Sequence, residues 1–464
     1  RYSDKAGMAQ IDRLTRLGAK NKRDFGRLNL RSISIPAQQL VQLAEETEVQ
    51  FIAADAVVKA SSVSARKTAN LPESDSVNFF PVDPNMTIAV LDSGISMHTD
   101  LNVAGRVDII PQATVCVETS TENLTATDGD SCDLLDPYGH GTHVAGAVSG
   151  DGTLSSYAYT GVAPGASVYS VRVLDHEGMG VASDVIAGLE WVLANAATHN
   201  IRVVNLSLGK GIEEGATTDP LVQAVEALWE AGIVVVASAG NYGNGGHFTI
   251  TSPGNSPKII TVGSLTDSGT GDDFTDDYVS TFSSRGPTVG DHYLKPDLLA
   301  PGNRYIAPIS TGAKLKKKLP KYAVGINYLE LSGTSMAAGV VSGAVALMLT
   351  QDPTLSPDTI KARLMRSARK IEENPTIAGA GVLDISAALN ETGVMTTAAL
   401  SPNMTLSTAE DGSQKVLVED TGALWGDAAW GAGYLWADGY LWADGYLWAD
   451  GYLWACLLYT SDAA

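Results

Sequence analysis

The chain has 464 residues, which is more than one average domain needs and indicates two or three structural units. Its formal net charge of −21 argues against nucleic acid as a partner, because binding to phosphates requires clustered lysine and arginine. No run of about eighteen or more apolar residues occurs, so the sequence predicts no membrane span.

Residues 1–68 predict a small α+β unit. Residues 28–35 alternate between apolar and polar positions with one slip, as expected of a half-buried strand. Pro36 stands where the first residue of a helix belongs, and residues 40–44 present an apolar face. Residues 49–52 indicate a second strand, so the predicted order is strand–helix–strand. The Ser-, Ala- and Thr-rich residues 60–70 are typical of a linker.

Residues 69–395 predict a larger α/β domain, in which buried strands alternate with helices. The predicted strands are largely apolar runs at residues 88–91, 167–174, 201–206, 233–237 and 259–262. The predicted helices lie at residues 140–148, 183–197, 221–230, 335–349 and 356–370. Short runs that are apolar on both faces are typical of a parallel sheet. We therefore expect a mostly parallel sheet with helices on both faces.

Residues 396–455 predict a low-complexity tail. Residues 433–454 repeat the hexapeptide Gly-Tyr-Leu-Trp-Ala-Asp about four times, and the even period places every Tyr and Trp on one side of an extended chain. Two interpretations stay open: a surface for self-association or wall attachment, or a poorly ordered tail without a defined partner. Residues 456–464 break the repeat and look like a translated sequencing adapter, so we exclude Cys456 from the natural cysteines.

Three segments carry the side chains of a nucleophilic hydrolase. Asp92 ends a predicted buried strand in IAVLDSGIS, whereas His140 in YGHGTHVAG and Ser335 in LSGTSMAAG open predicted helices. Active sites of open α/β sheets gather at the carboxyl ends of strands. A serine hydroxyl needs a base, histidine is that base near neutral pH, and an aspartate fixes the imidazole tautomer. The three residues are therefore candidates for a catalytic triad.

Together these segments resemble the subtilase family. The order Asp, His, Ser along the chain is the order in subtilisin. The resemblance spans residues 86–392 and includes FSSRGP at 282–287, KPDLLAPG at 295–302 and GAGVLD at 379–384. It implies a subtilisin-like three-layer α/β fold and a serine endopeptidase that works through an acyl-enzyme on Ser335. It also implies that residues 1–68 are a truncated propeptide, with self-cleavage within residues 59–70. A permanent accessory domain is the alternative.

The resemblance assigns the other site residues as well. Asn241, at the end of ASAGN, matches the residue that donates its side-chain amide to the oxyanion, with the Ser335 backbone N–H as the second donor. We expect the substrate to lie as an added strand between two edge segments, residues 177–180 and 207–209. Residues 238–240 are expected to line the first specificity pocket, with Thr251 near its base. The residues assigned to substrate binding are Gly178, Gly180, Ser207, Leu208, Gly209, Ser238, Ala239, Gly240 and Thr251. None is acidic, so we expect a preference for apolar or neutral side chains before the cleaved bond.

This chemistry requires no cofactor. His140 and His143 have a spacing that zinc sites use, but the HExxH pattern is absent and the family context favours a structural role for His143. The family implies structural calcium, to which we assign no residues, so any metal site stays unknown. In an exported protein, Cys116 and Cys132 would form one loop-closing disulfide; two unpaired thiols are the alternative.

The resemblance implies a secreted enzyme, although the chain begins at Arg1 without a signal peptide, which we interpret as removal or truncation. One departure from the family pattern is Gly339, where GTSMA-x-Pro has proline. A proline in the first turn of a helix loses no hydrogen bond, so Gly339→Pro is expected to stabilise the protein by about 0.4–1 kcal/mol.

Two other functions are weighed against the peptidase. Acyl transfer to an amine, as in peptide-ligating relatives, uses the same residues and differs only on the leaving-group side of the site. A surface or adhesion protein would use an inert subtilase scaffold and the aromatic repeats, but the catalytic residue types are intact. The expected partners are polypeptide substrates and the chain's own propeptide, with no nucleic acid and no membrane.

Overall fold

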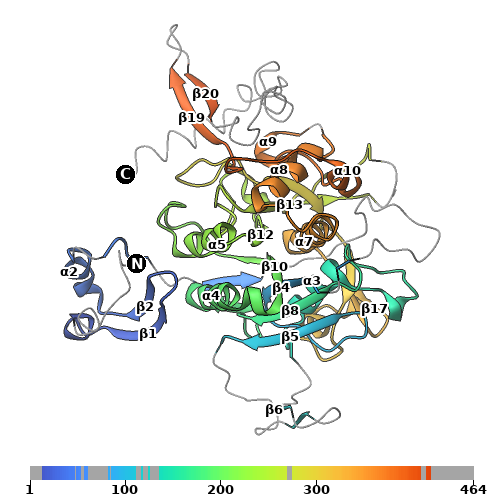
Figure 1. Ribbon diagram of the computed structural model, residues 1–464, viewed down its shortest axis with the longest axis horizontal. Coiled ribbons are helices and arrows are strands. Elements are labelled where there is room, and N and C mark those ends of the chain that lie inside the picture. Colours follow the sequence, from blue (N-terminus) through green and yellow to red (C-terminus); the bar gives the residue numbers. More distant parts are fainter. Residues whose placement is uncertain are drawn as a thin grey trace.

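A computed structural model gives the fold of the chain (Figure 1). It describes residues 13–46, 49–53, 57–60, 82–83, 85–110, 117–118, 124–125, 135–268, 274–371, 373–408 and 414–419. The predicted Cys116–Cys132 bridge, most of the predicted linker, the hexapeptide repeats and residues 456–464 lie outside the described residues.

The centre of the larger domain is an eight-stranded sheet in the order β14-β13-β12-β10-β4-β8-β5, with β15 pairing to β13. All of these pairs are parallel except β13 with β14. The strands are β4 (Thr87–Asp92), β5 (Asn102–Asp108), β8 (Ser167–Arg172), β10 (Ile201–Leu206), β12 (Val234–Ser238), β13 (Ile260–Thr266), β14 (Tyr278–Val279) and β15 (Leu298–Pro301). Every residue of β4, β12 and β13 is buried, as expected of strands covered on both faces.

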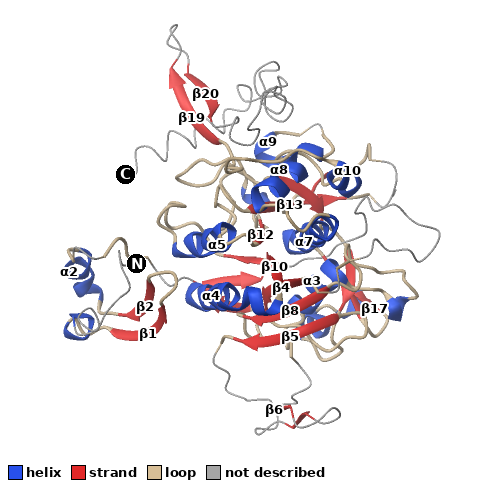
Figure 2. Ribbon diagram, viewed as in Figure 1, coloured by secondary structure: helices blue, strands red, loops and turns tan. Residues whose placement is uncertain are grey.

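Helices cover both faces of this sheet (Figure 2). On one side α3 (His140–Ser149) packs against α7 (Thr334–Gln351), and on the other side α4 (Ala182–His199) packs against α5 (Pro220–Glu230). The start of α8 (Pro357–Ser367) follows the sequence signal, because Ser356 caps the helix and Pro357 is its first residue. The predicted fold class, a mostly parallel sheet with helices on both faces, is confirmed.

Smaller elements surround this core. They are β3 (Val57–Ala60), β6 (Val117–Glu118), β7 (Leu124–Thr125), η2 (Thr153–Ser155), β9 (Met179–Val181), β11 (Leu208–Gly209), η3 (Gly243–Gly245), β16 (Tyr305–Pro308), α6 (Lys314–Lys318), η4 (Pro320–Tyr322), β17 (Ala323–Val324), β18 (Tyr328–Leu331), α9 (Pro375–Ala378), α10 (Ile385–Asn390), β19 (Asn403–Thr408) and β20 (Gln414–Glu419). The hairpin of β19 and β20 projects from the domain (Figure 1).

The N-terminal unit differs from its prediction. Its described part is an antiparallel pair, β1 (Lys20–Phe25) and β2 (Leu30–Ser34), followed by η1 (Ala37–Gln39) and α2 (Leu40–Ala44). The prediction missed β1, and the strand that follows the helix is β3 at residues 57–60, whereas the described residues 49–53 contain no strand. β1 has the sequence KNKRDF, which lacks the apolar alternation typical of a half-buried strand, so only its pairing with β2 reveals it.

Gly339 lies deeper in its helix than expected. Because α7 begins at Thr334, Gly339 is its sixth residue rather than part of the first turn, and it is buried. A Cβ added there would stand 3.2 Å from both the Ala147 Cβ and the Val144 carbonyl oxygen of α3. A proline would also remove an N–H from the helix interior. The premise of the expected stabilisation by Gly339→Pro is therefore wrong.

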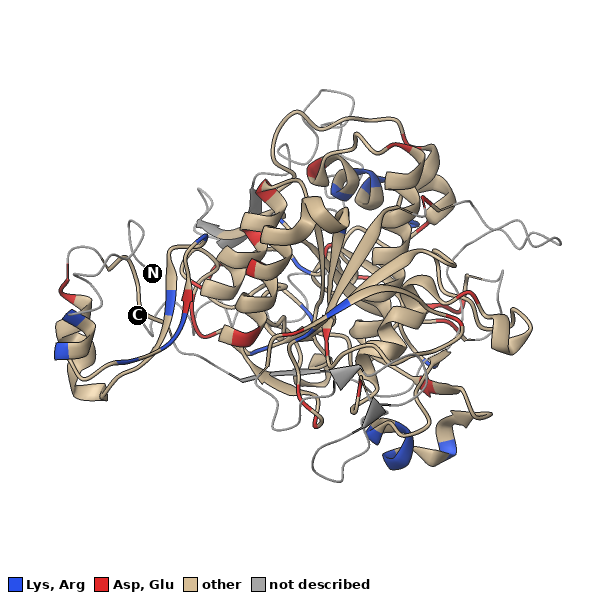
Figure 3. Ribbon diagram, turned by 60° about the horizontal axis from the view of Figure 1, so that its bottom comes forward, with Lys and Arg blue, Asp and Glu red and all other residues tan. Residues whose placement is uncertain are grey.

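Charged residues and the apolar helix α7 are distributed as expected of a domain with one large hydrophobic core. Acidic and basic residues are interspersed over the elements, and α6 is a short basic helix (Figure 3). Among the described residues one helix, α7, is long and apolar enough to cross a membrane, but 89% of it is buried inside the domain. Such burial is typical of the core helix of a folded domain.

Candidate active site

Two members of the predicted triad are joined by a hydrogen bond. Asp92 is the last residue of β4, at the carboxyl edge of the sheet, and His140 is the first residue of α3. His140 Nδ1 lies 2.8 Å from Asp92 Oδ1 and 2.9 Å from Oδ2, and both side chains are wholly buried. Because a carboxylate only accepts hydrogen bonds, Nδ1 is the donor, and the neutral imidazole has its lone pair on Nε2.

The third member, Ser335, is the second residue of α7. Its Oγ donates to the Ser207 carbonyl oxygen at 3.2 Å, and Ser207 Oγ donates in return to the Ser335 carbonyl oxygen at 2.8 Å. This exchange fixes the hydroxyl against the residue that directly follows β10. α3, which begins at His140, packs against α7, whose second residue is Ser335.

Hydrogen bonds to its side-chain oxygen hold Asn241 in place. Asn241 Oδ1 accepts hydrogen bonds from the Thr334 backbone N–H and from Thr334 Oγ1, each at 3.0 Å. Thr334 Oγ1 also accepts from the Gly240 N–H at 3.2 Å. With its oxygen engaged, the amide nitrogen Nδ2 is the group left to donate to a ligand. Thr334 was not predicted as a site residue, because no pattern marks it apart from its position next to Ser335.

The two predicted edge segments flank a short strand of the N-terminal unit. β3 lies between β9 and β11 in a separate three-stranded sheet and is antiparallel to both. In this register Val58 pairs with Gly180, and Lys59 pairs with Met179 on one side and with Gly209 on the other. Ala60 pairs with Leu208. β3 therefore pairs with both of the segments that the sequence assigns to substrate binding.

Two glycines shape these edges. Gly178 has φ +74°, and a Cβ there would meet the Tyr138 ring at 2.4 Å. Gly180 is close to the backbone behind it, because an added Cβ would lie 2.5 Å from the Val173 carbonyl oxygen. Larger residues at either position would displace the strand that lines the cleft. Tyr138, two residues before His140, is a cleft residue that the sequence analysis missed.

Thr251 lies between the predicted pocket segment, residues 238–240, and the edge segment that ends at Gly209. Its N–H and its Oγ1 donate to the Ala239 carbonyl oxygen at 3.0 and 3.3 Å. An added Cβ would lie 2.6 Å from Thr251 Oγ1 at Gly209, and 2.8 Å from Thr251 Cγ2 at Gly240. Ser238, the remaining predicted pocket residue, ends β12 and is buried. The walls and the base of the predicted pocket are thus in direct contact.

His143, on α3 after His140, lies in the interior of the domain. Its ring is buried, its Nε2 lies 2.9 Å from the Leu329 carbonyl oxygen, and burial lowers its pKa to about 3. Within the described part of the chain, no group of three or more His, Cys, Asp or Glu side chains is placed to hold a metal ion.

Comparisons with known proteins agree with this geometry. The family model described as the Subtilase family matches residues 83–394. The chain is 36% identical to the "Serine protease AprX" of Bacillus subtilis (strain 168) over 79% of this chain and 80% of the relative. It is 31% identical to "Subtilisin E" of the same organism, over 81% and 85%. It is also 31% identical to the "Extracellular serine proteinase" of Thermus sp. (strain Rt41A), over 72% and 69%. The chain belongs to the subtilase family and is a subtilisin-like serine endopeptidase.

Proposed function

We propose that the protein hydrolyses peptide bonds through an acyl-enzyme on Ser335, with His140 as the base and Asp92 as its partner. The observation that carries the proposal is the buried hydrogen bond from His140 Nδ1 to Asp92, because it leaves Nε2 as the proton acceptor. Ser335 Oγ attacks the carbonyl carbon while its proton passes to Nε2. The same proton then moves to the leaving amine as the C–N bond breaks.

Deacylation uses the same groups in reverse. Water attacks the ester carbon as one of its protons passes to His140 Nε2, and the Ser335 oxygen recovers that proton when the ester bond breaks. In both halves the tetrahedral intermediate carries its negative charge on the former carbonyl oxygen. Asn241 Nδ2 and the Ser335 N–H are the proposed donors to this oxyanion, and the contacts of Thr334 with Asn241 Oδ1 support the orientation of the amide.

For the side chain before the cleaved bond, we propose a preference for small neutral residues. Thr251 touches the positions of both wall glycines, Gly209 and Gly240, so its side chain fills the space between the walls. The pocket residues 238–240 and Thr251 have no charge to pair with Arg or Lys. A large side chain would have to displace Thr251, which costs free energy in a packed site.

We also propose that the N-terminal unit is a propeptide that the enzyme cuts from itself. β3 occupies the cleft as a substrate would, and its last residue, Ala60, pairs with Leu208. Ser207, the residue before Leu208, accepts the hydrogen bond from Ser335 Oγ. A peptide substrate that continues this antiparallel register would pair its next residue with Ser207, beside that hydroxyl. The predicted cut is therefore between Ser61 and Ser62.

We propose that the enzyme is exported. The name of the Thermus relative describes an extracellular proteinase, and the acidic composition suits a solvated protein outside the cell. The Cys116–Cys132 bridge that we predicted would form in such a compartment.

The test of the proposed activity is labelling of the full chain by a fluorophosphonate, followed by mass spectrometry of the N-terminus. We expect the label on Ser335 and a new N-terminus at Ser62, both lost in Ser335→Ala. The Ser207→Ala variant is a control that keeps the nucleophile and should still be labelled. No labelling of a folded wild-type chain would favour the inert adhesion protein, and aminolysis products with an added peptide amine would favour acyl transfer. Processing that continues in Ser335→Ala would assign the cut to another protease.

A further inference from the structure

A second buried carboxylate, Asp136, lies next to the triad and has no part in the mechanism above. It stands four residues before His140 and is wholly buried. Its Oδ1 accepts from Ser93 Oγ at 2.7 Å and from the Gly139 N–H at 2.8 Å. Its Oδ2 accepts from the Thr142 N–H at 2.8 Å and from Thr142 Oγ1 at 2.7 Å. One carboxylate thus binds residues on both sides of His140.

The same carboxylate reaches the segment that carries Asp92. The Ser93 N–H donates to Asp92 Oδ1 at 2.7 Å, and Ser93 Oγ lies 3.2 Å from the same oxygen. Ser93 Oγ also accepts from the Gly141 N–H at 3.1 Å. Ser93 therefore bridges the two carboxylates and contacts the first turn of α3. A displacement of Asp136 would move the end of β4 and the start of α3 relative to each other.

We propose that Asp136 is a positioning residue for the reaction, which holds His140 and Asp92 in register and stabilises the imidazolium formed during attack. Gly139, the residue before α3, offers no side chain as a cap, and Asp136 supplies the missing acceptors. A buried carboxylate that is hydrogen-bonded to residues on both sides of His140 favours the protonated imidazole, because the low-dielectric interior screens its charge weakly. Burial raises the pKa of Asp136 itself, whereas the four donors stabilise its ionised form.

Other ionisable groups also act on the imidazole and must stay unchanged in the test. Asp92 contacts it directly, and His143 on α3 interacts with it electrostatically. The Tyr138 ring stands 6.4 Å from the His140 ring. On α6, the Lys314 N–H donates to the Pro137 carbonyl oxygen, and the Lys314 ammonium pairs with Glu177. A substitution at Asp136 changes none of these side chains chemically.

The decisive variant is Asp136→Asn, which keeps the shape and removes the charge. We expect kcat to fall about 10- to 100-fold with little change in KM, as is typical when a reacting group is displaced. We expect the acid limb of the pH profile of kcat/KM to move about half a unit or more to lower pH, because the imidazolium loses a favourable charge. A purely structural role would lower the melting temperature and leave the pH midpoint in place.

The matched control is Asp100→Asn. Asp100 is also buried and follows β4, but its carboxylate contacts the Leu154 N–H and the Tyr328 hydroxyl, away from the start of α3. Asp100→Asn should lower the melting temperature without moving the midpoint of the pH profile of kcat/KM. If Asp136→Asn does not fold, Ser93→Ala and Thr142→Val test the same links, and we expect a lower kcat from each.

The inference would be overturned by a folded Asp136→Asn enzyme that has the wild-type kcat and the wild-type midpoint in the pH profile of kcat/KM. Wild-type kcat in both Ser93→Ala and Thr142→Val would also overturn it. The inference rests on the proposed function, which is checked separately. Fluorophosphonate labelling of the wild-type enzyme must succeed first, and its failure would count against the proposed function and not against the role of Asp136.

Discussion

In the proposed function, the side chain of Thr251 sets the depth of the specificity pocket. This side chain is 4% exposed and stands against the glycine positions 209 and 240. Phenylalanine buries a much larger surface than serine and needs a pocket of matching volume. Size at this position should therefore control which bonds the enzyme cuts, including the bond in its own chain.

We predict that Ser61→Phe slows self-cleavage and that Thr251→Gly restores it in the double variant. Forcing a large group into a filled site costs about 1–3 kcal/mol, which corresponds to a rate loss of about 5- to 150-fold. The rate is measured as loss of the full chain on gels after refolding. Ser64→Phe, on the leaving-group side of the proposed cut, is the matched control and should be cut at the wild-type rate. An unchanged rate for Ser61→Phe would contradict both the register and the pocket.

At the scale of elements, the described part of the N-terminal unit contacts the catalytic domain through β3, through the buried side chains of Phe25, Leu28 and Leu30, and through two arginines. The guanidinium of Arg23, on β1, pairs with Asp184 at the start of α4 at 2.9 Å and donates to the Ile109 carbonyl oxygen at 2.8 Å. The Arg27 N–H donates to Glu190 further along α4. The side chains of Arg23 and Asp184 are 25% and 16% exposed, so water screens this pair only partly. The proposed propeptide therefore depends on Arg23 for docking as well as on β3.

Arg23→Gln should accelerate release of the cut propeptide. Removal of a partly buried, charge-assisted contact costs about 1–2 kcal/mol, so we expect activity to appear roughly tenfold sooner after cleavage. The measurement is the lag before hydrolysis of a chromogenic peptide. Arg13→Gln provides the control, since Arg13 pairs with Glu46 inside the N-terminal unit and both side chains are well exposed. Equal lags for the two variants would argue that Arg23 does not hold the propeptide.

Sequence patterns predicted the elements that have strong periodicity and missed those that pairing creates. The strands β4, β8, β10, β12 and β13 and the helices α3, α4, α5, α7 and α8 could be predicted because apolar runs and caps mark them locally. β1 could not, because its polar sequence becomes a strand only beside β2. The triad came from three motifs, whereas the roles of Thr334 and Asp136 depend on contacts across the fold. Such contacts leave no periodic signal in a single sequence.

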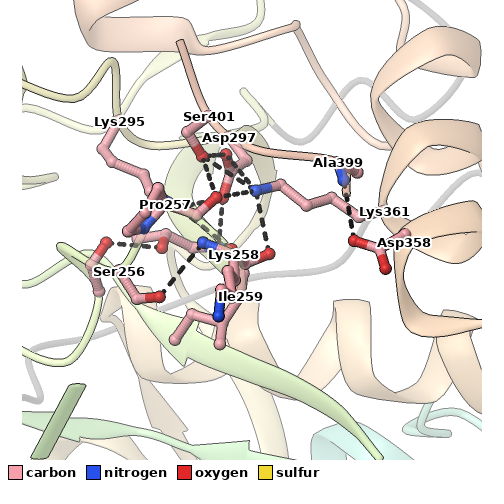
Figure 4. Close-up of polar contacts among 12 residues, drawn as sticks. Ser256, Pro257, Lys258, Ile259, Lys295, Asp297, Asp358, Lys361, Ala399 and Ser401 are labelled. Carbon is pink, nitrogen blue, oxygen red and sulfur yellow. Dashed lines mark hydrogen bonds and ion pairs between the residues drawn. The ribbon is translucent and has the colours of Figure 1, made fainter. Parts of the chain in front are cut away.

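Over the whole molecule, one buried ionic cluster joins segments that are far apart in the chain (Figure 4). Asp297 lies between two lysines: Lys295 Nζ is 2.7 Å from its Oδ2, and Lys361 Nζ on α8 is 3.4 Å from its Oδ1. All three side chains are wholly buried. Ser401 Oγ donates to Asp297 Oδ1 at 2.6 Å, and Lys361 Nζ lies 2.9 Å from Ser401 Oγ. Through Ser401, the cluster therefore binds residues beyond the predicted domain boundary at residue 395 to the catalytic domain.

This cluster has two ammonium groups for one carboxylate, so it has an excess positive charge when all three groups are ionised. Burial lowers the pKa of Lys295 to about 7, with the second lysine adding to the effect, although Asp297 opposes it. Burial also lowers the pKa of Lys361, whereas the lysines lower that of Asp297 against the effect of burial. Loss of one proton from Lys295 leaves a neutral pair of Lys361 and Asp297. The cluster should therefore become more stable as the pH rises through neutrality.

We predict that Lys295 makes the free energy of unfolding increase with pH above about 7. Between the folded pKa of about 7 and the unfolded pKa of about 10.4, the unfolded chain binds more protons than the folded one, and stability rises with pH in that window. From pH 6 to pH 9 the gain is about 2–3 kcal/mol. Lys295→Met should lose this gain, because methionine has no proton to release.

Denaturant unfolding at several pH values measures the effect, in a Ser335→Ala background that prevents self-digestion. The control is Lys258→Met: Lys258 is partly exposed, pairs with Glu226 and Glu230, and has a raised pKa. The difference in the free energy of unfolding between Lys258→Met and the parent should not change between pH 6 and pH 9. The difference for Lys295→Met should change steadily over the same range, in favour of the parent. Parallel curves for the two variants would mean that Lys295 stays charged in the folded protein, and that the two lysines share Asp297 at every pH at which the enzyme is folded.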